Sequence, residues 1–251
     1  MPPADALSER FGIIGLGAFG ALMARELARV GEVVAFDSDA SVRAPEGVSL
    51  APFETVAASP VVVLAVNAQR LSAVIDAVSP YLSEGAVVAD VCSVKVRPID
   101  LMLEGLPRHA RVVGTHPLFG PQTVGEKGLA GQPIALCEGR ADGDVMDRAR
   151  ALLAETLGLR VVETSADEHD RQMAFVQALT HLVGHAANDM DLPNLDLATL
   201  AYRRLLQLKG NILGDSEELF EAIQQWNPHA AGVRARFLDA MHAVHDRAGP
   251  A

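Results

Sequence analysis

Short apolar runs rich in β-branched residues alternate with helical segments from Phe11 to about Ser165. The runs occupy 11–17, 32–37, 60–66, 86–91, 111–116, 132–138 and 159–164. Helical periodicity falls between several of them, for example at 18–30 and 142–158. Near-continuous apolar strands separated by helices are typical of a mainly parallel sheet with helices on its faces. The sequence therefore predicts an α/β domain.

The strand pattern stops after Ser165. The segment 165–190 opens with a capping-box spacing, Ser165 followed by Glu168, and then carries apolar residues at helical spacing. Pro193 breaks this pattern, and further helices are predicted at 197–213, 216–226 and 228–248. We expect an α/β domain over 1–165 and an all-α domain over 166–251. Because the second is small for an independent core, we expect a second subunit to complete it.

Composition narrows the class of protein. The 251 residues are 49% hydrophobic and 21% charged, and the longest apolar runs, such as 60–66, are too short to span a membrane. The first ten residues lack a basic start followed by an apolar segment, so we expect no signal peptide and a cytoplasmic location. Cys92 and Cys137 follow apolar runs and are expected to be buried and reduced. The net charge of −11 without a basic stretch argues against nucleic-acid and membrane partners, but not against a small anionic ligand.

A glycine motif lies between the first predicted strand and the first predicted helix. "GLGAFG" places Gly15, Gly17 and Gly20 in the G-x-G-x-x-G spacing that brings a backbone turn and a helix N-terminus to a pyrophosphate. Alone, this glycine spacing is weak evidence for dinucleotide binding. Asp37 strengthens it, because an acid at the end of the second strand binds the ribose 2′-hydroxyl of a dinucleotide. The pattern predicts a Rossmann-type dinucleotide-binding domain.

Asp37 also bears on the choice of dinucleotide. A carboxylate there repels a 2′-phosphate, Ser38 supplies no cation, and Arg43 is the nearest basic residue. The sequence therefore favours NAD over NADP. The residues expected to contact the cofactor are Gly15, Leu16, Gly17, Ala18, Phe19, Gly20, Asp37, Ser38, Ala65 and Val66.

A histidine lies where another predicted strand gives way to a loop. In "VVGTHPLFGP", Pro117 and Pro121 cannot continue a sheet ladder and Gly120 permits a turn, which leaves His116 at the strand end. Such a histidine, taken alone, is a packing residue or a catalytic group. Ser93 of "CSVK" follows the preceding strand, as a helix cap or as a second site residue. Ligands of open α/β sheets bind at these carboxyl ends, so both residues are candidate catalytic groups.

Three segments, "VADVCSVK", "VVGTHPLFGP" and "DEHDRQMAFVQALTHL", resemble the prephenate/arogenate dehydrogenase family of tyrosine biosynthesis. The resemblance covers nearly the whole chain. It implies an N-terminal Rossmann domain, a helical C-terminal dimerisation domain, and a homodimer. It also implies NAD(P)-dependent oxidative decarboxylation of prephenate to 4-hydroxyphenylpyruvate, or of arogenate to tyrosine. In this family the residue matching His116 hydrogen-bonds the C4 hydroxyl, and the residue matching Ser93 supports the hydroxyl and nicotinamide end.

The predicted long helix carries Gln177, Thr180, His181 and His185 on one face at helical spacing. The resemblance points Thr180 and His181 toward the substrate, with His181 as a donor, and leaves His185 either structural or functional. His181 and His185 also form H-x-x-x-H. The motif lacks the glutamate of a metalloprotease and shows no third ligand, so we expect no metal.

A substrate carboxylate calls for an arginine, whose planar fork binds carboxylates bidentately. By resemblance Arg203, directly after Tyr202, is the first candidate and Arg236 the second. Family members often carry an acidic residue where this chain has Gln122. Glu126 is nearby, across a stretch expected to be flexible. This favours prephenate over arogenate, which would need a carboxylate partner for its ammonium group.

Two other functions are compatible with a dinucleotide domain followed by helices. A β-hydroxyacid-type dehydrogenase would need a catalytic lysine early in the long helix, where this chain has none between Ser165 and Met190. A non-catalytic NAD-binding regulator would bind the cofactor without turnover and would not need His116 and Ser93 to converge.

Overall fold

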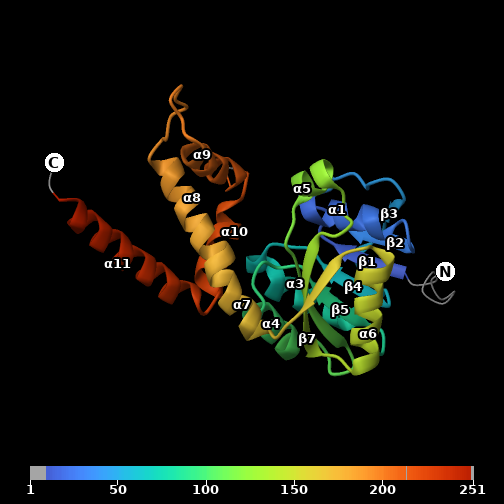
Figure 1. Cartoon of the computed structure of the whole chain (residues 1–251). Coiled ribbons are helices and arrows are strands. Elements are labelled where there is room, and N and C mark those ends of the chain that lie inside the picture. The colour runs from blue at the N-terminus through green and yellow to red at the C-terminus, as the bar shows by residue number, and fades with distance from the viewer. Residues whose placement is uncertain (1–9, 213, 250–251) are drawn as a thin grey trace. The chain divides into compact units, whose positions relative to one another are not determined.

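The computed structural model describes residues 10–212 and 214–249, and the chain divides into two compact units (Figure 1). The sheet unit is Met1–Ala166 and the helical unit is Asp167–Ala251. The first nine residues, on which the expectation about a signal peptide rests, and Leu213, at the end of one predicted helix, lie outside the described part. No helix of the described residues is long and apolar enough to cross a membrane.

In its described part the sheet unit contains one eight-stranded sheet in the order β3-β2-β1-β4-β5-β6-β7-β8. The first six strands in chain order pair in parallel, β7 runs antiparallel to β6, and β8 pairs in parallel with β7. The mainly parallel sheet is thus confirmed. The short edge strand β3 was not predicted. The strands are β1 (Arg10–Ile14), β2 (Glu32–Phe36), β3 (Val48–Leu50), β4 (Val61–Leu64), β5 (Val87–Asp90), β6 (Arg111–Pro117), β7 (Pro133–Arg140) and β8 (Arg160–Glu163).

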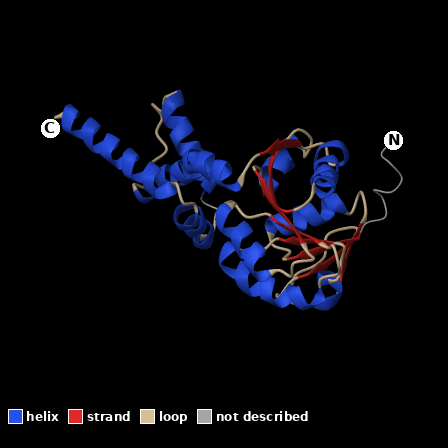
Figure 2. Cartoon of the chain, turned by 90° about the horizontal axis from the view of Figure 1, so that it is seen from below, coloured by secondary structure: helices blue, strands red, loops and turns tan. Residues whose placement is uncertain are grey.

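Helices lie on both faces of this sheet (Figure 2). The chain leaves β1 toward β2 in one direction and passes from β4 to β6 in the other, so right-handed crossovers place α1 on one face and α3 and α4 on the opposite face. The helices are α1 (Ala18–Leu27), α2 (Phe53–Ala57), η2 (Ala68–Arg70), α3 (Leu71–Val78), η3 (Ser79–Tyr81), α4 (Val96–Gly105), α5 (Pro121–Lys127), α6 (Gly143–Ala151) and the π-helical η4 (Leu152–Thr156).

The core of the sheet unit consists largely of residues from the apolar runs that predicted the strands. Phe11 and Ile13 of β1, Val33 of β2 and Leu136 of β7 are buried and belong to one cluster with the inner face of α1. Cys92 and Cys137 are both buried, as expected, and no disulfide joins them. The core therefore fixes the sheet, and with it the edge where the strands end.

The helical unit begins with one long continuous helix that changes its winding on the way. It consists of α7 (Ala166–Met173), the π-helical η5 (Ala174–Leu179) and α8 (Thr180–Asp189). The spacing predicted a regular α-helix here. That prediction was wrong at η5, and Gln177, which lies inside the π segment, does not follow the α-helical spacing assumed for it.

The remaining helices are α9 (Leu200–Ile212), α10 (Glu217–Glu221), the π-helical η6 (Ala222–Trp226) and α11 (Ala230–Ala248). The buried Gln224 of η6 connects them to the long helix. Its Nε2 donates to the carbonyl of Ala178 at 2.7 Å, and its Oε1 accepts from Arg234 Nη1 at 2.8 Å. The side chain thus gives a π-segment carbonyl a partner and joins η5, η6 and α11.

Candidate active site

The glycine loop has the conformation that the motif predicts. Gly15 has a φ of +97°, and a Cβ built on it would lie 2.3 Å from the carbonyl oxygen of Ala65. A Cβ on Gly20 would lie 2.1 Å from the carbonyl oxygen of Gly15, so α1 packs directly on the turn. A Cβ on Gly17, by contrast, would meet no described atom within 4 Å. The space beside Gly17, the N-cap residue of α1, is open to a ligand.

The N-terminus of α1 suits an anion. Gly17 provides no side-chain cap and the first turn contains no acidic residue, so its N–H groups remain available for a pyrophosphate. Ala65 and Val66 lie against Gly15 on the far side of the loop. The ring of Phe19, in the first turn of α1, lies 6.1 Å from the ring of Phe119 in the loop after His116. The glycine loop therefore contacts the histidine loop.

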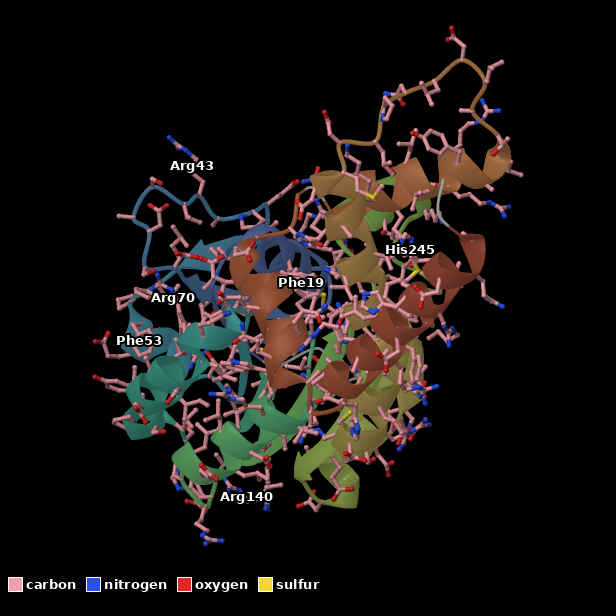
Figure 3. All side chains as sticks on the ribbon, turned by 90° about the vertical axis from the view of Figure 1, so that its left-hand side faces the viewer. Phe19, Arg43, Phe53, Arg70, Arg140 and His245 are labelled. Atoms are coloured by element: carbon pink, nitrogen blue, oxygen red, sulfur yellow. The ribbon has the colours of Figure 1, made fainter. Side chains whose placement is uncertain are left out.

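Asp37, just past the end of β2, holds this loop in place. Its Oδ2 accepts from the N–H of Leu16 at 2.6 Å and its Oδ1 accepts from the N–H of Asp39 at 2.9 Å. Each carboxylate oxygen has a second acceptor site, which fits the two ribose hydroxyls of a dinucleotide. Ser38 is exposed, and Arg43 extends into solvent (Figure 3). Within the described residues the Arg43 side chain makes no hydrogen bond or ion pair.

His116 lies at the carboxyl end of β6 and is only 4% exposed. The strand continues one residue further than expected, because Pro117 still pairs with Ile134 of β7 and needs no N–H on its free side. β5 and β6 pair in parallel up to Asp90 and Gly114. Ser93 and His116 follow those two positions closely, so both lie at the sheet edge where the glycine loop leaves β1. The structure therefore brings the three predicted features to one edge.

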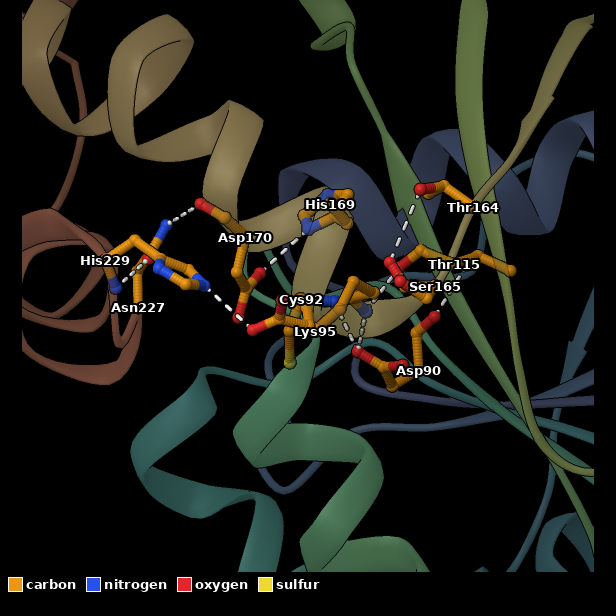
Figure 4. A network of polar contacts seen from close by, with 11 residues as sticks. Asp90, Cys92, Lys95, Thr115, Thr164, Ser165, His169, Asp170, Asn227 and His229 are labelled. Atoms are coloured by element: carbon orange, nitrogen blue, oxygen red, sulfur yellow. Dashed lines mark hydrogen bonds and ion pairs between the residues drawn. The ribbon is translucent and has the colours of Figure 1, made fainter.

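A buried ion pair lies in the same turn, and the sequence reasoning missed it. The ammonium of Lys95 pairs with the carboxylate of Asp90, and both side chains are 0% exposed (Figure 4). The available signal was an aspartate at the end of an apolar run, Asp90, followed five residues later by a lysine, since a lysine is almost never fully buried unless it is paired. Cys92 lies between them, and burial, followed by the charge of Asp90, raises the pKa of its thiol. Cys92 is therefore a packed thiol and not a nucleophile.

Gln122 and Glu126 have a different setting from the one expected. The stretch between them is not an irregular loop, as the expected flexibility implied, but the helix α5 (Pro121–Lys127). Pro121 occupies the first position of this helix, where a proline is favourable, and the two side chains lie one turn apart. The amide of Gln122 donates to Glu126 Oε1 at 3.2 Å. A carboxylate therefore lies beside the position that the resemblance associates with substrate choice.

In the helical unit several buried polar atoms on the long helix have no hydrogen-bond partner among the described residues. Gln177 Oε1, His181 Nδ1 and His185 Nε2 are buried and make no hydrogen bond within the described part of the chain. Burial lowers the pKa of His181; the carboxylate of Asp215, at 3.7 Å from its Nδ1, opposes this and His185 adds to it. Buried polar atoms without partners are unfavourable in an empty site and are satisfied by a polar ligand.

The other predicted residues of this unit are engaged or exposed. The hydroxyl of Thr180 lies within hydrogen-bond distance of the carbonyls of Val176 and Gln177, and the ring of His185 lies 4.2 Å from that of Phe220. Arg203 is exposed, and its guanidinium makes no hydrogen bond or ion pair among the described residues. Arg236 lies over the ring of Phe175 at 5.7 Å. The substrate roles of these residues stay predictions.

A second polar cluster fixes the start of the helical unit (Figure 4). His169 and Asp170, both buried, pair at 2.8 Å, and Asn227 Nδ2 donates to the carbonyl of Asp170 at 2.7 Å. His229 pairs with Asp167 at 2.8 Å. These bonds join α7 to the segment between η6 and α11. Among the residues that the structure describes, no group of three or more His, Cys, Asp or Glu side chains could hold a metal ion.

Comparison with known proteins places these features in a family. The family model for the nucleotide-binding domain of prephenate dehydrogenase matches residues 24–163, and a model described as TYRAAT1-like, C-terminal domain, matches residues 186–247. A 4-amino-4-deoxyprephenate dehydrogenase of Streptomyces pristinaespiralis is 32% identical over 88% of this chain and 78% of that protein. Arogenate dehydrogenase 1 of Arabidopsis thaliana is 30% identical over 96% of this chain and 39% of that protein.

Solved structures agree on the fold. Prephenate dehydrogenase from A. aeolicus, solved with hydroxyphenyl propionate and NAD+, superposes with a TM-score of 0.72 at 18% identity, over 95% of this chain and 90% of that one. The chain spans between 39% and 65% of the length of the Arabidopsis protein and of three other curated relatives. The nucleotide-binding domain predicted from the glycine motif is confirmed. Because the first model covers more than half of the 251 residues, this chain belongs to the prephenate dehydrogenase family.

Proposed function

We propose that this protein catalyses the NAD-dependent oxidative decarboxylation of prephenate to 4-hydroxyphenylpyruvate. One observation carries the proposal: in a nucleotide-binding domain of this family, the glycine loop and His116 meet at the same carboxyl edge of the sheet. A dinucleotide whose pyrophosphate is held at the glycine loop supplies the hydride acceptor, and a residue at the end of β6 supplies the base; this oxidation requires both. A β-hydroxyacid-type dehydrogenase or a regulator without chemistry would not need this pairing.

The reaction divides between cofactor and protein. Bound NAD supplies the acceptor for the hydride that leaves C4 of the substrate ring. His116 hydrogen-bonds the C4 hydroxyl and accepts its proton, because a neutral imidazole has one ring nitrogen that is free to accept. Ser93 supports the same hydroxyl. The C1 carboxylate leaves as CO2, its electron pair makes the ring aromatic, and the ring oxygen takes back the proton from His116. The protein has otherwise only to orient the substrate and to leave that carboxylate without a strong cation partner.

Prephenate and arogenate differ in one group, a keto oxygen against an ammonium. The amide of Gln122 supports prephenate, since it offers a neutral hydrogen-bond donor to the keto oxygen at the position where family members often carry an acidic residue. The carboxylate of Glu126, hydrogen-bonded to Gln122, supports arogenate as the second candidate. A third substrate, 4-amino-4-deoxyprephenate, is suggested by the name of the Streptomyces relative. In that case His116 would take its proton from nitrogen.

The proposal is tested by kcat/KM for the three substrates, each with NAD and with NADP. We expect the highest value for prephenate with NAD. A preference for arogenate would contradict the proposal that Gln122 selects the keto oxygen of prephenate. It would indicate instead that Glu126 binds the ammonium group of arogenate. Binding of NAD without turnover of any of the three would refute the proposal and favour the regulator.

We also propose that the protein is a homodimer formed through its helical unit. The second half of α11 is exposed, and Leu238, Met241 and Val244 are 47%, 51% and 50% exposed at a spacing of three residues. Three exposed apolar side chains, each about one turn from the next, suit a helix of a second copy. The cytoplasmic location expected from the sequence stays a prediction.

A further inference from the structure

Burying the ion pair of Lys95 and Asp90 carries a large desolvation free energy, so the pair adds little to the stability of the fold. Both side chains are 0% exposed, and the second carboxylate oxygen of Asp90, Oδ1, has no hydrogen-bond partner within residues 10–212 and 214–249. Two charges taken out of water recover that cost only with complete hydrogen bonding, and an apolar pair of similar volume is often as stable. The pair is therefore better explained by what it holds than by the stability that it adds.

Its hydrogen bonds connect three segments at the carboxyl edge of the sheet (Figure 4). Lys95 Nζ donates to the carbonyl of Thr115 at 2.6 Å as well as to Asp90 Oδ2. Thr115 Oγ1 donates to the carbonyl of Asp90 at 2.6 Å, and Asp90 Oδ2 accepts from the N–H of Cys92 at 2.9 Å. The end of β5, the turn that carries Ser93 and the last part of β6 are thus bonded to one another.

These bonds begin where the strand ladder stops. The β5–β6 register ends at Asp90 and Gly114, so Thr115 has no strand partner on its β5 side. The ammonium of Lys95 takes the place of that partner. The carbonyl that it binds belongs to the peptide that joins Thr115 to His116. Lys95 therefore fixes the backbone of His116 on one side, and the turn between Asp90 and Lys95 fixes Ser93 on the other.

We propose that Lys95 and Asp90 are positioning residues, which hold His116 and Ser93 in the geometry that the reaction needs. The inference rests on the proposed function. Lys95 has no exposed surface and cannot touch the substrate, so it acts through the backbone. A displacement of about 1 Å in a reacting group can lower the rate about a hundredfold, whereas a cofactor bound at the glycine loop is held by other residues.

The test compares wild type with the double variant Lys95→Met/Asp90→Asn, which removes both charges, keeps the shape of Asp90 and shortens the Lys95 side chain by one atom. We expect kcat to fall about 10- to 100-fold, while KM and the NAD dissociation constant stay within about threefold. In NMR spectra of the histidine side chains, assigned with His116→Asn, the His116 signals should move and those of His109 should not. Arg108→Met, an exposed cation at the opposite edge of the sheet, is the control and should change neither kcat nor the His116 signals.

A double variant with kcat within twofold of wild type and unmoved His116 signals would overturn the proposal. So would a joint loss of kcat and NAD affinity with a lowered melting temperature, which is the behaviour of a general stabilising pair. If the double variant does not fold, Thr115→Val removes one bond of the network and Thr115→Ser restores it, and kcat should follow that order. If wild type turns over none of the three substrates, the proposed function fails, and the His116 signals alone decide the positioning role.

Discussion

Asp37 is the residue on which we predict cofactor choice to depend, and in this structure it also holds the glycine loop. Its carboxylate accepts from Leu16 N and Asp39 N, and it still presents acceptor sites for ribose hydroxyls. Asp37→Asn keeps an acceptor for Leu16 but loses the charge. We expect the NAD dissociation constant, measured by calorimetry, to rise about tenfold, the effect of about 1.5 kcal/mol for one charge-assisted hydrogen bond. The preference for NAD over NADP should narrow.

Asp39→Asn is the matched control for this prediction. Asp39 is exposed, and its side chain accepts hydrogen bonds from Ser41, away from the glycine loop. The Asp39→Asn variant should therefore bind NAD with the affinity of wild type. An unchanged NAD affinity in Asp37→Asn would show that the carboxylate supports only the loop and does not bind the ribose.

Arg203 and Arg204 are exposed neighbours on α9, and only the first is predicted to bind substrate. Arg203→Ala should raise KM about 10- to 100-fold with a smaller effect on kcat, because a carboxylate clamp binds substrate and transition state alike. Arg204→Ala, measured in the same assay, should keep the wild-type KM. An unchanged KM in Arg203→Ala would transfer the role to Arg236.

At the scale of elements, Arg140 joins β7 to the end of α4. Its guanidinium donates to four carbonyls, those of Leu103, Leu106, Pro107 and Ala110, and so satisfies the unpaired C-terminus of the helix. Arg140→Met should lower the free energy of unfolding by about 3 kcal/mol, from the loss of several partly exposed charged hydrogen bonds.

Denaturant unfolding checks this prediction, with Arg108→Met as the control. Arg108 is exposed and makes no hydrogen bond or ion pair in the described part of the chain, so its variant should stay within about 0.5 kcal/mol of wild type. Equal stabilities of the two variants would contradict this prediction. They would mean that water hydrogen-bonds the carbonyls at the end of α4 as favourably as Arg140 does.

The elements also show how far the sequence leads. The parallel strands and the glycine turn follow from local patterns, because apolar β-branched runs and glycine spacing act over a few residues. The π segments η4, η5 and η6 do not follow from such patterns. The carbonyl of Ala178 in η5, for instance, is bonded by Gln224, which is distant in sequence. The helix α5 was missed because it is short and contains a glycine.

The candidate site divides in the same way. Gly17, Asp37, Ser93 and His116 could be located from motif and strand order alone. The Lys95–Asp90 pair could not, because its meaning depends on the carbonyl of Thr115, which belongs to another strand. Sequence spacing shows which residues end a strand, and only the folded chain shows which backbone groups lack a partner there.

At the scale of the whole molecule, the helical unit is predicted to need a second copy. Met241→Asp places a charge in the apolar stripe of α11 and should shift the protein from dimer to monomer in sedimentation experiments at micromolar concentration. Asp239→Asn, between the stripe residues, is the control and should remain dimeric. A monomeric wild type would contradict the homodimer.

The central claim is that His116 performs the proton transfer of an NAD-dependent decarboxylating oxidation. The most direct measurement follows NADH and CO2 together, with prephenate and NAD, for wild type and for His116→Asn. We predict one CO2 per NADH in wild type. In the variant, NAD binding should be unchanged and kcat should be lower by about 10²- to 10⁴-fold, the contribution of a general base. A variant that binds NAD and keeps near-normal kcat would contradict the claim.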